Sequence, residues 1–84
     1  MKITFKLYAS LTEYLPAEAR RDNRVALDVP PEASIQQIIE PYGLPVKLVH
    51  LVLVNGVYVP PAERMTRTLV EGDVLAIWPP IAGG

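Results

Sequence analysis

The side chains that usually perform chemistry are scarce in this 84-residue chain. There is no cysteine, which excludes disulfides, thiolate metal sites, a side-chain persulfide and a thiol nucleophile. The single histidine, His50, lies just before a hydrophobic segment and has no carboxylate beside it in the sequence, so a nucleophile–base pair is not indicated. We expect His50 to be a solvated or edge histidine and the chain not to be an enzyme.

Metal and phosphate sites are not predicted either. A metal ion needs several His, Asp or Glu side chains at fixed spacing, and Glu71-Gly72-Asp73 is better explained as a turn. The five glycines lie at positions 43, 56, 72, 83 and 84, so no glycine-rich phosphate loop is present. We therefore expect the chain to bind no metal and no cofactor of its own.

The C-terminal tail, residues 81–84, differs from the rest because it ends in a free carboxylate on two glycines. Pro79 and Pro80 fix φ and favour extended backbone, so the tail should leave the last strand in a defined direction. Gly83 and Gly84 have no Cβ, so this backbone can enter a channel too narrow for side chains. At about 7% glycine usage, such a pair arises by chance about once in 200 chains, which leaves an unselected terminus as an alternative.

Other side chains with binding potential have simpler interpretations. A patch for an acidic partner could be formed by the arginines at positions 20, 21, 24, 64 and 67. Charged loops are more often merely solvated. We expect Trp78, like Phe5, to be a core residue and not a stacking platform, because each alternates with other apolar positions.

Hydrophobic periodicity indicates the elements that must position the tail. Strands are predicted at 2–8, 25–29, 51–54, 57–59 and 74–78, the third and fourth joined by an Asn55-Gly56 hairpin turn. Ser34 and Gln37 form a capping box for a helix that carries an apolar stripe and stops near Pro41. A second capping box is predicted at Ser10, opening a short helical turn that Pro16 closes.

The order strand, strand, helix, three strands predicts a two-layer α+β domain with a mixed sheet of about five strands packed on one main helix. We expect residues 1–80 to form this domain and residues 81–84 a flexible tail. The length suits a single domain.

Composition and charge restrict the partners. A net charge of −1 and scattered basic residues do not favour nucleic acid. No segment approaches the roughly 20 apolar residues of a membrane span, and no signal peptide is visible at the start. We expect a soluble, cytoplasmic protein without a membrane partner.

Taken together, these residues resemble the ubiquitin-like β-grasp sulfur carriers of the MoaD/ThiS type, which include the small subunit of molybdopterin synthase and the sulfur carrier of thiamine biosynthesis. The similarity covers nearly the whole chain. Its most specific part runs from Leu69-Val70-Glu71-Gly72-Asp73-Val74 through Trp78-Pro79-Pro80-Ile81-Ala82 to Gly83-Gly84, with weaker matches at Val54-Asn55-Gly56 and Tyr8-Ala9-Ser10-Leu11. The Pro-Pro pair favours the molybdopterin branch, whereas Gly43-Leu44-Pro45 and His50-Leu51-Val52 resemble less characterised ubiquitin-like domains.

The resemblance implies a β-grasp roll and a non-catalytic role in sulfur transfer. A ubiquitin-activating-type enzyme would use ATP to adenylate the Gly84 carboxylate, and a sulfurtransferase system would convert it to a thiocarboxylate. Gly83, Ala82, Ile81 and Pro80 would thread into the partner, which is the large subunit of molybdopterin synthase or another sulfur acceptor. The resemblance also implies docking through a hydrophobic face of the sheet.

Alternative functions share the same terminus. The sulfur could serve thiamine or another metabolite, or Gly84 could form isopeptide bonds as in a protein modifier. A third alternative is an interaction module with an inert tail.

Overall fold

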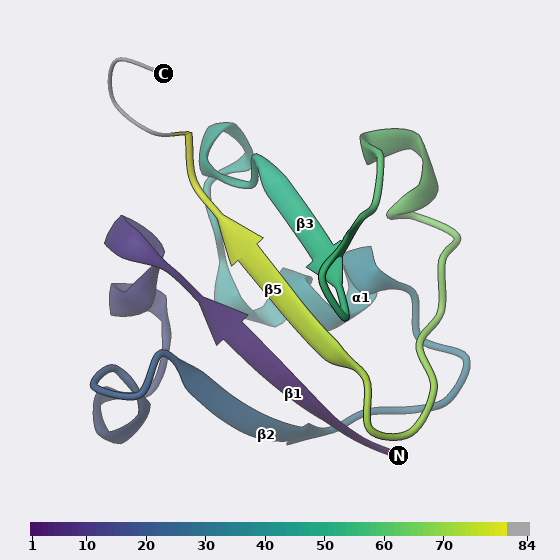
Figure 1. The fold of residues 1–84 in the computed structure, drawn as a ribbon, viewed down its shortest axis with the longest axis horizontal. Helices are drawn as coiled ribbons and strands as arrows, with labels where there is room; N and C mark the ends of the chain where they lie inside the picture. Colours follow the sequence, from purple (N-terminus) through teal and green to yellow (C-terminus); the bar gives the residue numbers. More distant parts are fainter. Residues whose placement is uncertain (81–84) are drawn as a thin grey trace.

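In the computed structural model, which describes residues 1–80, the chain forms one mixed five-stranded sheet with a short helix against one face (Figure 1). The strands and helix are β1 Lys2–Leu7, β2 Arg24–Asp28, α1 Ile35–Ile39, β3 Leu51–Val54, β4 Val57–Tyr58 and β5 Val74–Trp78. Short 3-10 turns lie at Ala9–Tyr14, Ala17–Ala19, Glu40–Tyr42, Val46–Leu48 and Pro61–Glu63. This is the predicted architecture of five strands and one main helix.

The strand order in the sheet is β2-β1-β5-β3-β4. The first and last strands, β1 and β5, are parallel neighbours in the middle of the sheet, and every other neighbouring pair is antiparallel. Because β1 and β5 run the same way, β5 ends at the end of the sheet opposite to the N-terminus (Figure 1). The chain therefore approaches its tail from an interior strand.

The core lies between the sheet and α1. Alternate strand residues point into it, as the period-2 pattern predicts. The helix contributes three buried isoleucines, at positions 35, 38 and 39. The largest side chains that are fully buried are Phe5, Leu7, Leu11, Leu15, Ile35, Val52, Val59, Leu75 and Ile77.

The capping box at the start of α1 is confirmed. The Ser34 Oγ accepts a hydrogen bond from the Gln37 backbone N–H at 3.2 Å, and the Gln37 Oε1 accepts one from the Ser34 N–H at 2.9 Å. After α1 the chain forms the 3-10 turn Glu40–Tyr42. This turn ends at Gly43, whose φ of 66° is left-handed. Gly43 thus stops the helix as predicted.

The capping box predicted at Ser10 is wrong. A 3-10 helix does form there, but it begins at Ala9, its N-cap is Tyr8, and no side chain caps it. Ala9 enters the turn with a φ of 52°, and the Thr12 hydroxyl donates to the Ala9 carbonyl at 2.9 Å. Tight i to i+3 backbone bonds satisfy this turn without a reciprocal side-chain cap.

The hairpin turn between β3 and β4 is confirmed and is tied to the next strand. Asn55 and Gly56 have φ values of 51° and 83°, as a two-residue type I′ turn requires. The buried Asp73 carboxylate accepts hydrogen bonds from the Asn55 Nδ2 and the Val70 N–H, both at 2.9 Å. The Asn55 Oδ1 accepts from the Val74 N–H at 2.9 Å, so the turn and the start of β5 are fixed together.

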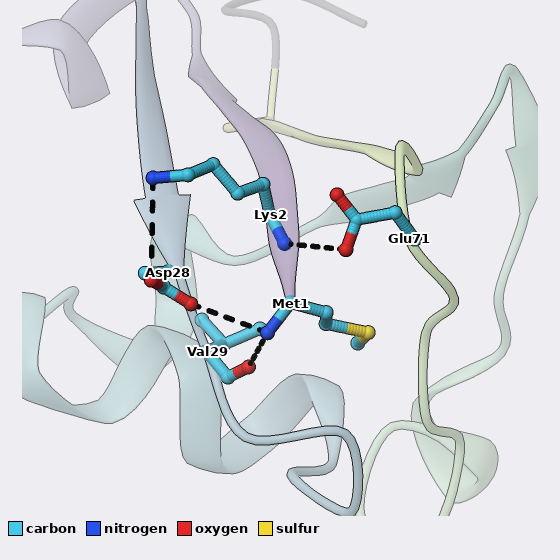
Figure 2. Close-up of polar contacts among 5 residues, drawn as sticks. All are labelled: Met1, Lys2, Asp28, Val29 and Glu71. Atoms are coloured by element: carbon cyan, nitrogen blue, oxygen red, sulfur yellow. Dashed lines mark hydrogen bonds and ion pairs between the residues drawn. The ribbon is translucent and has the colours of Figure 1, made fainter.

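The N-terminus is held at the end of the sheet where β1 begins. The Met1 ammonium group lies 3.2 Å from Asp28 Oδ1 and donates to the Val29 carbonyl at 2.8 Å (Figure 2). The Lys2 Nζ is 4.0 Å from Asp28 Oδ2, and the Lys2 N–H donates to Glu71 Oε1 at 2.9 Å (Figure 2). These contacts join β1 to β2 and to the turn before β5.

Candidate functional site

The predicted site residues fall on both sides of the described boundary. Gly84, Gly83, Ala82 and Ile81 lie outside the described residues, so the roles given to them stay predictions. Pro80 is described and is exposed to solvent, while Pro79 before it is buried. The structure therefore describes this site only as far as Pro80, the position from which the tail departs.

This position is the carboxyl end of β5, and hydrogen bonds hold it on both sides. The Tyr8 N–H donates to the Ile77 carbonyl at 3.2 Å, and the His50 N–H donates to the Trp78 carbonyl at 3.2 Å. Both bonds continue the ladders by one residue, at Tyr8 after the last residue of β1 and at His50 before the first residue of β3. The chain is thus fixed up to Trp78, two residues before Pro80.

Trp78 is not a core residue, which corrects the sequence-based expectation. Its ring stacks on that of Tyr8 with centroids 3.9 Å apart and planes 2° apart. Within β5 the fully buried residues are Leu75 and Ile77, so Trp78, like Val74 and Ala76, points to the face opposite to the helix. The sequence did not indicate this orientation, because β5 is entirely apolar and has no polar residue to mark its outer face. Phe5, in contrast, is fully buried as expected.

The strand registers place one row of side chains across all five strands on this outer face. Successive partners in the row are Arg24 of β2, Lys6 of β1, Ala76 of β5, Leu53 of β3 and Tyr58 of β4. The row is cationic on the β2 side and apolar or aromatic on the β4 side. Ala76 at its centre is small and buried, so the side chains around it cover the middle of the face.

The apolar half of this face continues toward the tail. Leu51 pairs with Trp78 across β3 and β5 and is 37% exposed. Tyr58 on the edge strand is 47% exposed. We name the outer-face residues of β5, β3 and β4 the apolar sheet face: Val74, Ala76, Trp78, Leu51, Leu53 and Tyr58. It includes Trp78 and Leu51 at the carboxyl end of β5, where the tail departs, and the sequence alone did not locate it.

The arginines do not gather into the patch that the sequence left open as an alternative to solvated loops. Arg64 is only 7% exposed, and its guanidinium donates to the carbonyls of Val59 (3.1 Å), His50 (3.1 Å) and Val49 (3.4 Å). Its Cζ lies 5.9 Å from the centroid of the Tyr58 ring. Arg64 is therefore an internal clamp that joins three segments, and it does not present its charge to a partner.

The remaining arginines are dispersed over the molecule. Arg67 is exposed near the helix, since its carbonyl accepts the Ile35 N–H at 2.9 Å. Arg20 is exposed and donates through Nε to the Leu15 carbonyl at 3.1 Å. Arg24 alone faces the outer side of the sheet beside the predicted site.

Two other features could offer a site away from the tail. His50 is exposed, and within residues 1–80 no group of three or more His, Asp or Glu side chains is placed to hold a metal ion. Burial raises the pKa of Tyr42, but its ring lies 4.8 Å from that of Phe5, on the core side of the sheet. Neither feature forms a catalytic pair.

A groove of about 460 Å³ lies on the helix side, between the end of α1 and two connecting loops. Its lining is mostly apolar and includes Ile39, Leu44, Val49 and the strongly exposed Val46 and Met65. Among the described residues, none of the apolar sheet face lines it. We therefore place the candidate site at the tail exit and the apolar sheet face. In the described part of the chain, no helix has the length and apolar character to cross a bilayer.

Comparisons with known proteins agree with this fold. The sequence model of a family described as Mut7-C ubiquitin matches residues 1–82. No curated protein sequence matches the chain. Among solved structures, SAMP1 from Haloferax volcanii is similar at a TM-score of 0.68 and 24% identity, over 100% of both chains.

Two further solved structures show the same likeness. A second Haloferax volcanii protein, solved in solution, has a TM-score of 0.73 and 23% identity over 100% of this chain and 87% of its own. A Pyrococcus furiosus protein, provisionally assigned as molybdopterin converting factor subunit 1, has a TM-score of 0.62 and 19% identity over 96% of this chain and 99% of its own. The predicted ubiquitin-like β-grasp fold is confirmed.

Proposed function

Because the chain belongs to the Mut7-C ubiquitin family, we propose that it is a ubiquitin-like sulfur carrier whose Gly84 carboxylate is adenylated and then converted to a thiocarboxylate. The acceptor that we propose first is the large subunit of molybdopterin synthase, with thiamine or another sulfur-containing metabolite as the alternative pathway. The chain supplies no catalytic side chain and acts as the non-catalytic partner of both the adenylating enzyme and the acceptor enzyme.

The observation that carries this proposal is the way in which the chain leaves its fold. The last strand is interior, its end is bonded to both neighbours, and the exposed Pro80 follows two residues after Trp78 of the apolar sheet face. A partner that docks on this face would have the Gly83-Gly84 terminus within reach, at the end of the short tail that follows Pro80. Slim residues at that terminus permit entry into a narrow catalytic channel.

The chemistry balances without a side chain of this protein. In the adenylating enzyme, a Gly84 carboxylate oxygen attacks the α-phosphorus of ATP, and pyrophosphate leaves. A persulfide sulfur on a sulfurtransferase then displaces AMP, and a thiol reductant cleaves the acyl disulfide to leave the thiocarboxylate. The lack of cysteine agrees with this scheme, because the sulfur is carried on the backbone terminus.

A second candidate function is a protein modifier that forms isopeptide bonds to lysines. The likeness to SAMP1 over the full length of both chains favours it, because a further solved structure similar to this chain is described as small archaeal modifier protein 1 of the same organism. The adenylation step is common to both functions. They differ only in whether sulfur or a lysine amine receives the activated carboxyl group.

The test is the intact mass of the protein after incubation with ATP, the adenylating enzyme from the same genome, a sulfurtransferase and a sulfur source. We expect a mass gain equal to exchange of one oxygen for sulfur. A Gly84 deletion and a chain extended by one alanine after Gly84 should show no gain while keeping the fold of the unaltered protein. An unchanged mass, with the enzyme active on another carrier, would refute the carrier function.

The modifier function has its own measurement. Cells that produce either the unaltered chain or the Gly84 deletion are compared for covalent conjugates that survive denaturation. Conjugates present only with the unaltered chain would show modification of proteins. If the extended chain supported activity as well as the unaltered one, the tail would be inert.

A further inference from the structure

Two cations face each other across β1 and β2 close to the tail exit. Lys6 is the register partner of Arg24 on the outer face of the sheet, where Lys6 is half-buried and Arg24 is exposed. The ion pairs found within residues 1–80 both involve Asp28, so neither Lys6 nor Arg24 has a carboxylate within ion-pair distance there. Like charges directly opposite each other destabilise a sheet.

At their other end, the same two strands place opposite charges across from each other. There the register partner of Lys2 is Asp28, and the two side chains lie 4.0 Å apart as an ion pair (Figure 2). A pair of like charges is therefore not a general property of the β1–β2 ladder. It occurs only at the end nearest to the exit of the tail.

The like-charged pair is continuous with the apolar sheet face. Lys6 pairs with Ala76 on its other side, and two residues later Tyr8 stacks on Trp78, which itself precedes Pro80 by two residues. A surface that docks on the apolar sheet face with the tail in its channel would extend over Lys6 and Arg24. The charges on the bound surface would then determine whether the repulsion between the two cations is relieved.

We propose that Lys6 and Arg24 form the cationic margin of the docking face and receive carboxylates of the enzyme that adenylates Gly84. This proposal rests on the proposed carrier function and adds the chemistry of the partner, which is an acidic patch beside an apolar one. In the free chain the pair weakens the fold. In the complex, carboxylates on the partner neutralise both cations and draw the two surfaces together.

The charge pattern favours a protein partner over a polyphosphate. Nucleic-acid and ATP phosphates are bound by several converging donors or by a long basic stripe. Here two cations stand at the edge of a flat apolar surface, and the net charge of the chain is −1. Carboxylates at the rim of an apolar protein interface match that layout.

The test compares two double variants with the same change in charge. Lys6→Gln with Arg24→Gln removes the proposed pair. Lys2→Gln with Arg67→Gln removes two exposed positive charges remote from the tail exit. For each protein, ATP–pyrophosphate exchange by the adenylating enzyme of the same genome gives kcat, kcat/KM for the carrier and the KM for ATP, at low and high salt. Urea unfolding gives the stability of each chain without a partner.

We expect the pair variant to be more resistant to urea than the unaltered chain and to have a kcat/KM lower by about threefold to tenfold at low salt, with kcat unchanged. The difference should vanish at about 1 M salt, where the screening length is about 3 Å. The Lys2/Arg67 control should keep its kcat/KM, and because it gives up the Lys2–Asp28 ion pair it should not become more resistant to urea. The combination of higher stability and slower association separates a docking role from a structural one.

Three results would overturn the proposal: equal kcat/KM losses in both double variants, no rise in urea resistance, or a change confined to the KM for ATP, which would assign the pair to phosphate. If the unaltered chain is not adenylated at all, the proposed function fails and this proposal fails with it. In that outcome the unaltered protein supports no ATP–pyrophosphate exchange. Failure of the pair alone leaves the unaltered protein active.

Discussion

Replacing Arg64 by methionine should destabilise the fold although the residue lies in a polar connection of the sequence. Methionine keeps most of the aliphatic stem, so the variant removes chiefly the polar contacts. The guanidinium bonds the Val59 and His50 carbonyls at 3.1 Å each and the Val49 carbonyl at 3.4 Å. Val59 is buried, whereas His50 is exposed and its carbonyl can bind water instead.

The magnitude follows from these environments. An orphaned buried carbonyl costs about 1–3 kcal/mol, and an exchanged exposed bond about 0.5–1.5 kcal/mol. Removing the buried charge gives back part of its desolvation penalty. We therefore expect a loss of about 2–3 kcal/mol. That is a large part of the roughly 4–13 kcal/mol that an 84-residue domain is expected to possess.

The measurement is urea unfolding followed by the fluorescence of Trp78, the only tryptophan in the chain. The matched control is Arg67→Met, because Arg67 is exposed and should change stability by less than about 0.5 kcal/mol. In a thermal scan the Arg64 variant should melt lower by about 4–8 °C for each kcal/mol lost. If both variants lost the same small amount, the clamp interpretation of Arg64 would be wrong.

Three further perturbations test other parts of the structure. Ser34→Ala removes one half of the capping box and should lower the free energy of unfolding by about 1 kcal/mol in urea titrations, whereas an unchanged midpoint would show that the cap is dispensable. Asp73→Asn replaces one of two acceptor oxygens, so either the Asn55 Nδ2 or the Val70 N–H loses its partner; we expect a loss of about 1–3 kcal/mol and faster hydrogen exchange at Val70, and native exchange there would contradict this. Because the pKa of Tyr42 is raised by burial, its contribution to stability is complete below its ordinary value of 10.0 and is lost as pH rises through the higher folded-state pKa. Tyr42→Phe should therefore lose less stability than the unaltered protein when the pH of unfolding experiments is taken above about 10, and identical pH profiles would count against it.

Local patterns predicted most of the fold because local physics decides it. The alternation in β1, the Asn55-Gly56 turn and the box formed by Ser34 and Gln37 each involve neighbours within a few residues, and each is present. Ser10 shows the limit of such matching. The same motif occurs there, but Ala9 starts a tighter turn one residue earlier and leaves the box unused.

The other errors concern contacts between residues distant in sequence. Arg64 is bonded to carbonyls 14 and 15 residues away, and nothing in its own loop indicates that it is buried. Trp78 can be assigned to the outer face only once Leu75 and Ile77 are known to point toward the helix. An unbroken apolar strand does not reveal which of its two faces is buried. For the tail, the sequence predicts the reactive terminus at Gly84, and the structure supplies its point of departure at Pro80.

The parallel pairing of β1 with β5 also determines how the domain responds to mechanical force. The N-terminus leaves β1 at one end of the sheet and the chain leaves β5 at the other, while the two strands are direct neighbours (Figure 1). Tension between the two ends would slide β5 along β1 and load their evenly spaced hydrogen bonds simultaneously in shear, not one at a time as in unzipping. A chain that is pulled by its tail while its first strand is held should therefore resist extension better than one whose bonds break in turn.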